Sequence, residues 1–87
     1  MSRFDRLFEI PEDLEKDISK LTILNFDRVY IENYVCILEY QDYFIKIKMK
    51  DGIISINGIK LLMNEMTKED LIITGTIDSI EFEKFKE

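Results

Sequence analysis

Alternation of apolar and charged side chains is the feature that most constrains the fold of this 87-residue chain. In the segment Phe44–Lys50 the alternation has a period of two, which gives a strand one apolar face and one face lined by lysines. The dipeptide Asp51-Gly52 follows directly and suits a type I′ hairpin turn, and so does Asn57-Gly58 further along. The sequence therefore predicts antiparallel strands joined by short turns.

The same period continues from Leu21 to the C-terminus, in segments spaced roughly 7–11 residues apart. Parallel strands would need crossover connections of about a dozen residues, and the spacing leaves no room for them. The expected fold class is all-β: a small antiparallel β-sandwich or flattened barrel of about eight short strands. The expected strands are 21–24, 28–32, 35–40, 44–50, 54–56, 59–63, 70–74 and 77–85.

The first 20 residues have a different pattern from the rest. Pro11 suits the first position of a helix, and acidic residues follow it near the positive end of the helix dipole. Leu14, Ile18 and Leu21 are spaced by four and three, as on one helical face. We expect a short N-terminal α-helix over Pro11–Ser19, within an N-terminal arm (residues 1–20) that precedes a β domain (residues 21–87) in a single-domain protein. Whether residues 4–9 form a helical turn or an extended arm is left open.

Charge and hydropathy exclude several classes of function. Twelve basic residues against 18 acidic ones give a net charge of -6, which disfavours nucleic acid as a partner. Apolar runs are far shorter than the roughly 20 residues of a membrane-spanning helix, and no signal peptide pattern precedes the domain. The single cysteine fits a reducing compartment. We expect a cytoplasmic protein with no direct membrane insertion.

No pattern of residues points to catalysis, a metal or a cofactor. The chain contains no histidine, the residue that most readily exchanges protons at neutral pH and binds transition metals. Its carboxylates follow no spaced motif, and its three glycines are isolated at predicted turns. Cys36 lies in a segment that is apolar on both faces, which predicts a central strand and a buried thiol acting as a small hydrophobe. We expect that the protein is not an enzyme.

Lys46, Lys48 and Lys50 would lie on one face of a strand. They can be interpreted as a contact for an anion or phosphate, or as a solvated face opposite the acids Glu81 and Glu83. The first interpretation gives an alternative function, a small-molecule or anion-binding β domain. The net negative charge favours the second.

Aromatic and apolar residues outside the expected core are candidates for protein contacts. Tyr34 and Tyr43 fall at predicted turns, and aromatic side chains are enriched at interfaces. Phe4, Leu7 and Phe8 precede the β domain and could cover an open sheet or reach a partner chain. The edges of a small sheet can also accept a strand from another protein.

The ordered set of these segments resembles the YabP/YqfC family of sporulation proteins. In the second half of the chain the resemblance is carried by Ile54–Leu61 and Leu71–Phe82, each an apolar alternation with one glycine. The first half resembles the YqfC branch, through Phe8–Asp13, Val29–Asn33 and Ile37–Tyr40. The turn after Asn33 departs from the family, which tends to carry a basic or small residue where Tyr34-Val35-Cys36 stands here.

This resemblance implies a non-enzymatic protein that acts in the mother cell of an endospore-forming bacterium and has no cofactor. The YqfC branch is associated with a membrane-bound sporulation protein of the YqfD type. We therefore expect protein–protein contact with such a partner, with a second copy of the chain as a homo-oligomer, or with both. The partner would hold the protein at the forespore membrane.

Overall fold

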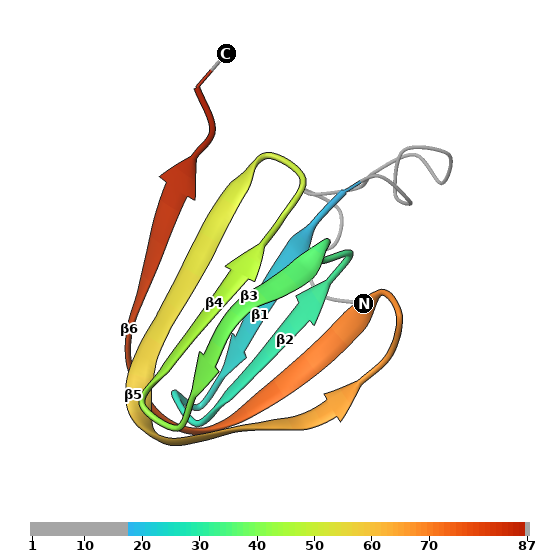
Figure 1. Cartoon of the computed structure of the whole chain (residues 1–87). Coiled ribbons are helices and arrows are strands. Elements are labelled where there is room, and N and C mark those ends of the chain that lie inside the picture. The colour runs from blue at the N-terminus through green and yellow to red at the C-terminus, as the bar shows by residue number, and fades with distance from the viewer. Residues whose placement is uncertain (1–17, 87) are drawn as a thin grey trace, which may run out of the picture.

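The computed structural model describes residues 18–86, which form an all-β fold of six strands (Figure 1). The predicted helix Pro11–Ser19 lies almost entirely outside these residues, as do Phe4, Leu7 and Phe8. The strand expected at Arg28–Glu32 has those bounds in the structure. The strands are β1 (Lys20–Leu24), β2 (Arg28–Glu32), β3 (Cys36–Gln41), β4 (Phe44–Lys48), β5 (Gly52–Met66) and β6 (Asp70–Lys84).

All six strands belong to one antiparallel sheet with the order β1-β2-β6-β5-β4-β3. Among the described residues β1 pairs with β2 alone and β3 with β4 alone, so these are the outermost strands and the sheet remains open. The predicted sandwich of two sheets or closed flattened barrel is thus not confirmed. The observed form is a single sheet that curves round on itself, with the curve at the bottom of the view in Figure 1.

The curvature comes from β5 and β6, which are 15 residues long and bend together. The β4 half of the sheet consists of β3, β4, the start of β5 and the end of β6. The β2 half consists of β1, β2, the start of β6 and the end of β5. Strands β4 and β2 each pair with one half of the long hairpin, which places them on opposite sides of the bend.

The concave face of the bent sheet carries the core. Ile45 and Ile47 from the β4 half are fully buried together with Val29 and Ile31 from the β2 half, because the two halves share one hydrophobic cluster. Met49 is also buried, as the alternation in its segment predicts. The buried core residues are Val29, Ile31, Ile45, Ile47, Met49, Ile54, Ile56, Leu61, Leu71 and Ile73.

The prediction of about eight strands was wrong because two expected turns are bends within strands. The backbone passes through Asn57-Gly58 without leaving β5, and a register shift lies between these two residues. Likewise β6 continues through Gly75, whose φ of 131° lies in a region that favours glycine. Each glycine therefore bends one long strand where the sequence pattern predicted two short ones.

The type I′ turn also occurs at a place that the sequence did not predict. Neither Asp51 nor Gly52 has a positive φ, although they join β4 to β5 as expected. Between β1 and β2, Asn25 and Phe26 have φ values of 54° and 60°. The N–H of Asp27 donates to the carbonyl of Leu24 at 3.2 Å, which closes the turn.

Candidate functional site

The outside of the bend is built from two hairpin turns that attach to the long strands. From the β3–β4 turn, the carbonyl of Tyr43 accepts a hydrogen bond from the N–H of Gly58 at 3.1 Å. From the β1–β2 turn, the carbonyl of Phe26 accepts one from the N–H of Ile77 at 3.0 Å. Gly58 and Ile77 are themselves cross-strand partners. Four backbone segments therefore lie side by side across the bend.

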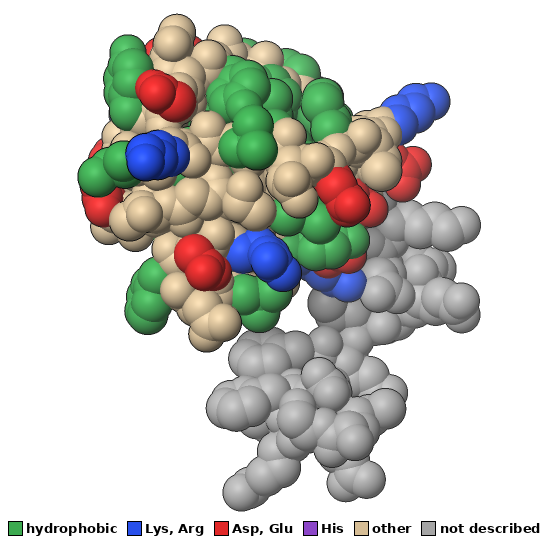
Figure 2. All heavy atoms as spheres, turned by 90° about the horizontal axis from the view of Figure 1, so that it is seen from below, with side chains coloured by type: hydrophobic (Ala, Val, Ile, Leu, Met, Phe, Trp, Pro, Cys, Tyr) green, Lys and Arg blue, Asp and Glu red, His purple; other side chains and the backbone are tan. Residues whose placement is uncertain are grey.

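Large apolar side chains at this bend are open to solvent. Phe26 is 78% exposed and Tyr43 61%, and next to them in the long strand β5 Ile59 is 56% exposed. Leu62, three residues further along, is 52% exposed. Figure 2 looks at the molecule from this end and shows several groups of hydrophobic side chains, with single charged side chains between them. We call Phe26, Tyr43, Ile59 and Leu62 the bend surface.

Phe26 combines this exposure with an unfavourable backbone. A positive φ is uncommon for a bulky residue and costs roughly 1–2 kcal/mol for side chains that have a Cβ. The benzyl side chain recovers little of that cost by burial, since it is the most exposed of the large hydrophobic residues in the described chain. Backbone strain of this kind concentrates at functional sites.

A second apolar surface lies where β1 faces the two ends of the β5–β6 hairpin. A groove of about 280 Å³ is lined there by Leu21, Met49, Ile54 and Phe82, among other residues. Phe82 pairs with the buried Ile54, so its ring lies on the concave face of the sheet, yet it is 68% exposed. We call this opening between β1 and the end of β6 the seam groove.

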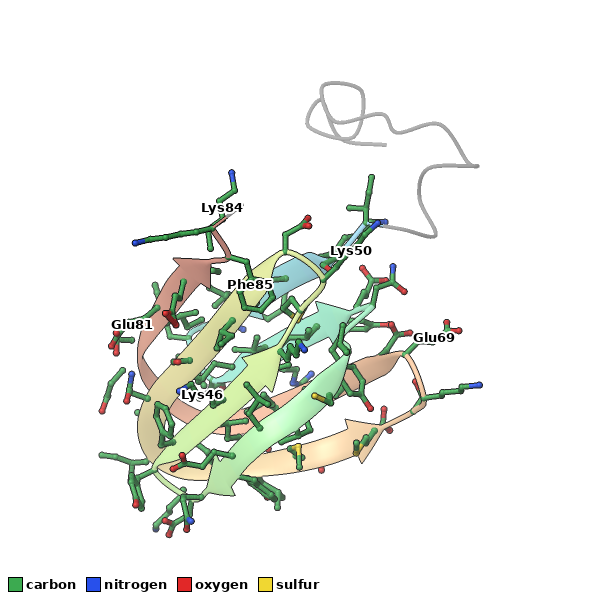
Figure 3. The ribbon with its side chains drawn as sticks, turned by 45° about the horizontal axis from the view of Figure 1, so that its top comes forward. Lys46, Lys50, Glu69, Glu81, Lys84 and Phe85 are labelled. Atoms are coloured by element: carbon green, nitrogen blue, oxygen red, sulfur yellow. The ribbon has the colours of Figure 1, made fainter. Side chains whose placement is uncertain are left out.

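The lysines expected on one face are distributed differently from the prediction. Lys46 and Lys48 lie on the convex face of β4, but β4 ends at Lys48 and Lys50 lies in the following turn. The predicted opposition to acids was also wrong, because β5 separates β4 from β6. Lys46 has Glu39 and Ser55 as its cross-strand partners, and Ser55 in turn pairs with Glu81 (Figure 3).

At the end of the sheet opposite the bend, lysines lie near one aromatic ring. Lys50 and Lys84 line a shallow hollow with Phe85, Asp51 and Lys86 (Figure 3). The hollow is fixed by the N–H of Phe85, which donates to the carbonyl of Asp51 at 2.9 Å. Its side chains are surface residues, and Phe85 is 40% exposed. This arrangement provides positive charge without an enclosed pocket.

The predicted contact residues Tyr34 and Tyr43 have different environments. Tyr43 is exposed on the bend surface. Tyr34 is half-buried against the core, and its hydroxyl donates to the carbonyl of Thr67 at 2.7 Å. The structure therefore ties Tyr34 to the β5–β6 turn and separates it from Tyr43. Phe26, Ile59 and Leu62 were missed, because each looked like an ordinary strand or turn residue in the sequence.

Cys36 was predicted to be buried in a central strand, and this prediction was wrong. It begins the edge strand β3, its side chain is exposed, and its cross-strand partner is Lys48. Between residues 18 and 86, no three His, Cys, Asp or Glu side chains gather in a group that could hold a metal ion.

Among the titratable residues that the structure describes, Tyr30 is the one whose pKa departs clearly from its ordinary value. It lies on the convex face of the β2 half, where burial of its hydroxyl raises the pKa above 10.0. The carboxylates of Asp70, Glu32 and Glu65 add smaller effects in the same direction. A tyrosine held neutral in this way does not act as a base near neutral pH. The raised pKa of Tyr30 therefore reflects desolvation first and the neighbouring carboxylates second.

Comparison with known proteins identifies the family. The family model described as "YabP family" matches residues 15–87, which include every strand of the sheet. The chain belongs to the YabP family. The resemblance seen in the motifs is thereby confirmed, including its YqfC branch. This YabP-family chain is 27% identical over 77 residues to a Bacillus subtilis protein named "Uncharacterized protein YqfC", covering 88% of this chain and 83% of the relative.

No solved structure matches this member of the YabP family. Nor does the described part of the chain contain a helix with the length and apolar character needed to cross a membrane.

Proposed function

We propose that this YabP-family chain is a non-enzymatic sporulation protein that works by protein–protein contact in the mother cell. Its partner in this proposal is a membrane-bound sporulation protein of the YqfD type, which would hold it at the forespore membrane. The bend surface provides the contact. Phe4, Leu7 and Phe8, outside the described residues, are proposed as a second contact.

The observation that carries the proposal is the strained and exposed Phe26. A solvent-facing turn has no structural need for a large apolar residue at a φ of 60°, where Gly or Asn is favoured. Tyr43 and Ile59 extend the apolar surface across the bend, and exposed apolar patches of this kind mark interaction sites. Aromatic anchors dominate binding energy in protein interfaces.

The alternative function, a small-molecule or anion-binding β domain, has weaker support. At about 280 Å³ the seam groove is at the lower limit of ligand sites, and it is open along one side. Lys46 has an acidic residue, Glu39, as a direct neighbour, which lowers its attraction for anions. Acidic and basic side chains both line the groove, among them Glu83 and Lys84, so its charge favours neither an anion nor a cation.

The proposal is tested by co-purification from bacteria that express this chain together with a tagged YqfD-type protein in detergent. Tyr43→Ser and Ile59→Ser, which remove apolar side chains from the bend surface, should each lower the captured amount at least about tenfold if they are binding anchors. Val35→Ser is the matched control, because Val35 is 54% exposed but lies away from the bend. Equal capture of all three variants and the wild type would refute the contact through this surface.

The N-terminal contact has its own experiment. A chain that begins at Pro11 lacks Phe4, Leu7 and Phe8 but keeps every described strand. The truncated protein should bind the partner more weakly and unfold at the same denaturant concentration as the full chain. Unchanged capture would remove these residues from the proposal and leave the bend surface in place.

A further inference from the structure

We infer that edge strand β1 pairs with β1 of a second copy of this chain and forms a sheet that is continuous across a twofold axis. The inference rests on the proposed function in taking the chain to act by protein–protein contact. It adds a second partner and a further contact surface, on the opposite side of the β1–β2 hairpin from β6. Three observations carry it: the chemistry of the free edges, the direction of the backbone groups of β1, and two exposed apolar residues beside it.

Most free edges of this sheet carry features that block strand addition. The edge strand β3 has a register shift between Ile37 and Glu39. The end of β6, beyond its pairing with β2, carries acidic residues at Asp78, Glu81 and Glu83. Self-pairing of such a segment in a chain of net charge -6 would bring like charges together.

The edge of β5 in the β2 half is protected against strand addition by a side chain from the β4 half of the sheet. The N–H of Met63 donates to the hydroxyl of Tyr40 at 3.1 Å, so this edge donor is already satisfied. Strand β1 differs from the other edges. Its residues Leu21–Leu24 contain no charged side chain, no proline and no register shift in their pairing with β2.

The hydrogen bonds of β2 fix the direction of the backbone groups of β1. The N–H of Gly75 donates to the carbonyl of Asp27 at 3.2 Å, so Asp27 directs its carbonyl toward β6. Along an antiparallel strand the backbone N–H and C=O groups of successive residues point alternately to the two sides. Those of Tyr30, three positions after Asp27, therefore point toward its partner Thr22. The backbone N–H and C=O groups of Thr22 likewise point toward β2. The N–H and C=O groups of its neighbours Leu21 and Ile23 point away from the sheet.

These outward groups are self-complementary. In an antiparallel pair of β1 strands centred on Thr22, Leu21 of one copy lies opposite Ile23 of the other and exchanges backbone hydrogen bonds with it. Thr22 lies opposite Thr22 across the axis, a favourable cross-strand pair with closely spaced side chains. The interface is isologous, as a twofold dimer requires.

The same pairing explains two apolar residues that the bent sheet leaves uncovered. Ile23 pairs with the buried Val29 and Phe82 with the buried Ile54, so both side chains lie on the concave face. Nevertheless Ile23 is 45% exposed and Phe82 is 68% exposed. Both residues belong to strands beside the seam groove, where the β2 half ends at β1. A second β1 strand would extend the β2 half beside the seam groove, which Phe82 lines, and would add apolar surface there.

The test introduces a charge at position 22. Thr22 lies on the proposed axis and is exposed in the single chain. Sedimentation velocity of the full chain from about 1 μM to about 1 mM should show a dimer that dissociates on dilution, since a short edge gives a small interface. Thr22→Lys and Thr22→Glu should each weaken the dimer about fivefold or more, because like charges then face each other. An equimolar mixture of the two variants should restore dimerisation.

Three further variants separate pairing from folding. Ile23→Pro removes the outward N–H and should abolish the dimer, while Ile23→Val keeps the N–H and should preserve it. Thr76→Lys places the same charge on an exposed threonine of β6 and should leave the dimer unchanged. A monomeric wild type across the whole range overturns the inference, as do position-22 variants that dimerise like the wild type.

The outcome also separates this inference from the proposed function. Thr22→Lys should still be captured by the membrane-bound partner, because the bend surface is intact. A monomeric wild type that is captured refutes the β1 dimer alone. A dimer that captures no partner refutes the proposed function alone.

Discussion

Gly58 and Ile77 face each other across the β5–β6 hairpin at the point where both strands bend, and each is bonded on its other side to a hairpin turn. Gly58 donates to the carbonyl of Tyr43 and Ile77 to that of Phe26. One cross-strand pair thus fixes the positions of the two aromatic residues of the bend surface. The bend therefore determines both the curvature of the sheet and the composition of its proposed contact surface.

Gly58→Ala should destabilise the fold. A Cβ at position 58 would collide with the backbone carbonyl of Thr76, which cannot move without disturbing the hairpin, and would lie 2.8 Å from Cδ2 of Leu61. We expect a loss of about 1–3 kcal/mol in the free energy of unfolding, measured by urea denaturation. Ser55→Ala, in the same strand, is the control and should change the stability by less than about 0.5 kcal/mol. Equal stability of the two variants would contradict the tight approach at the bend.

Tyr40→Phe should loosen the contact between the two halves of the sheet. The hydroxyl of Tyr40 accepts the hydrogen bond of the Met63 N–H at 3.1 Å, and its removal leaves that edge donor to water. The expected loss is about 0.5–1.5 kcal/mol, together with faster amide hydrogen exchange at Met63. Tyr43→Phe, which removes an exposed hydroxyl, should change neither quantity. Unaltered exchange at Met63 in Tyr40→Phe would show that the bond is unimportant.

Alkaline pH should reveal the environment of Tyr30. Its folded-state pKa is raised above 10.0, so the folded protein holds this proton more tightly than the unfolded chain. Its contribution to stability is fully present below the unfolded pKa and is lost as the pH rises through the folded pKa. Wild-type protein should therefore lose more stability than Tyr30→Phe between about pH 9 and about pH 11. Identical losses in urea denaturation at the two pH values would contradict the raised pKa.

The sequence predicted the strands well where one face is buried and the other solvated. Arg28–Glu32 and the buried positions Ile45 and Ile47 followed from alternation, because burial of one face imposes a period of two. The prediction of strand ends failed at Gly58 and Gly75, since a glycine that bends a strand and a glycine that ends one give the same local sequence pattern.

The candidate site was harder to predict than the strands. Tyr43 was recognised as a turn aromatic, whereas Phe26 was not, because a bulky residue at a positive φ is disfavoured by local sterics. Asn25, directly before it, was the available signal, since Asn favours type I′ turns. Cys36 was misplaced because an edge strand that is apolar on both faces resembles a central one.

The central claim is that Phe26 is retained for contact with a partner at a cost in stability. Phe26→Gly tests it most directly, since Asn-Gly is the preferred type I′ pair. Urea denaturation should show the variant to be more stable than the wild type by about 1 kcal/mol, and capture by the membrane-bound partner should fall at least about tenfold. A variant that is less stable, or one that is captured as well as the wild type, would contradict the account.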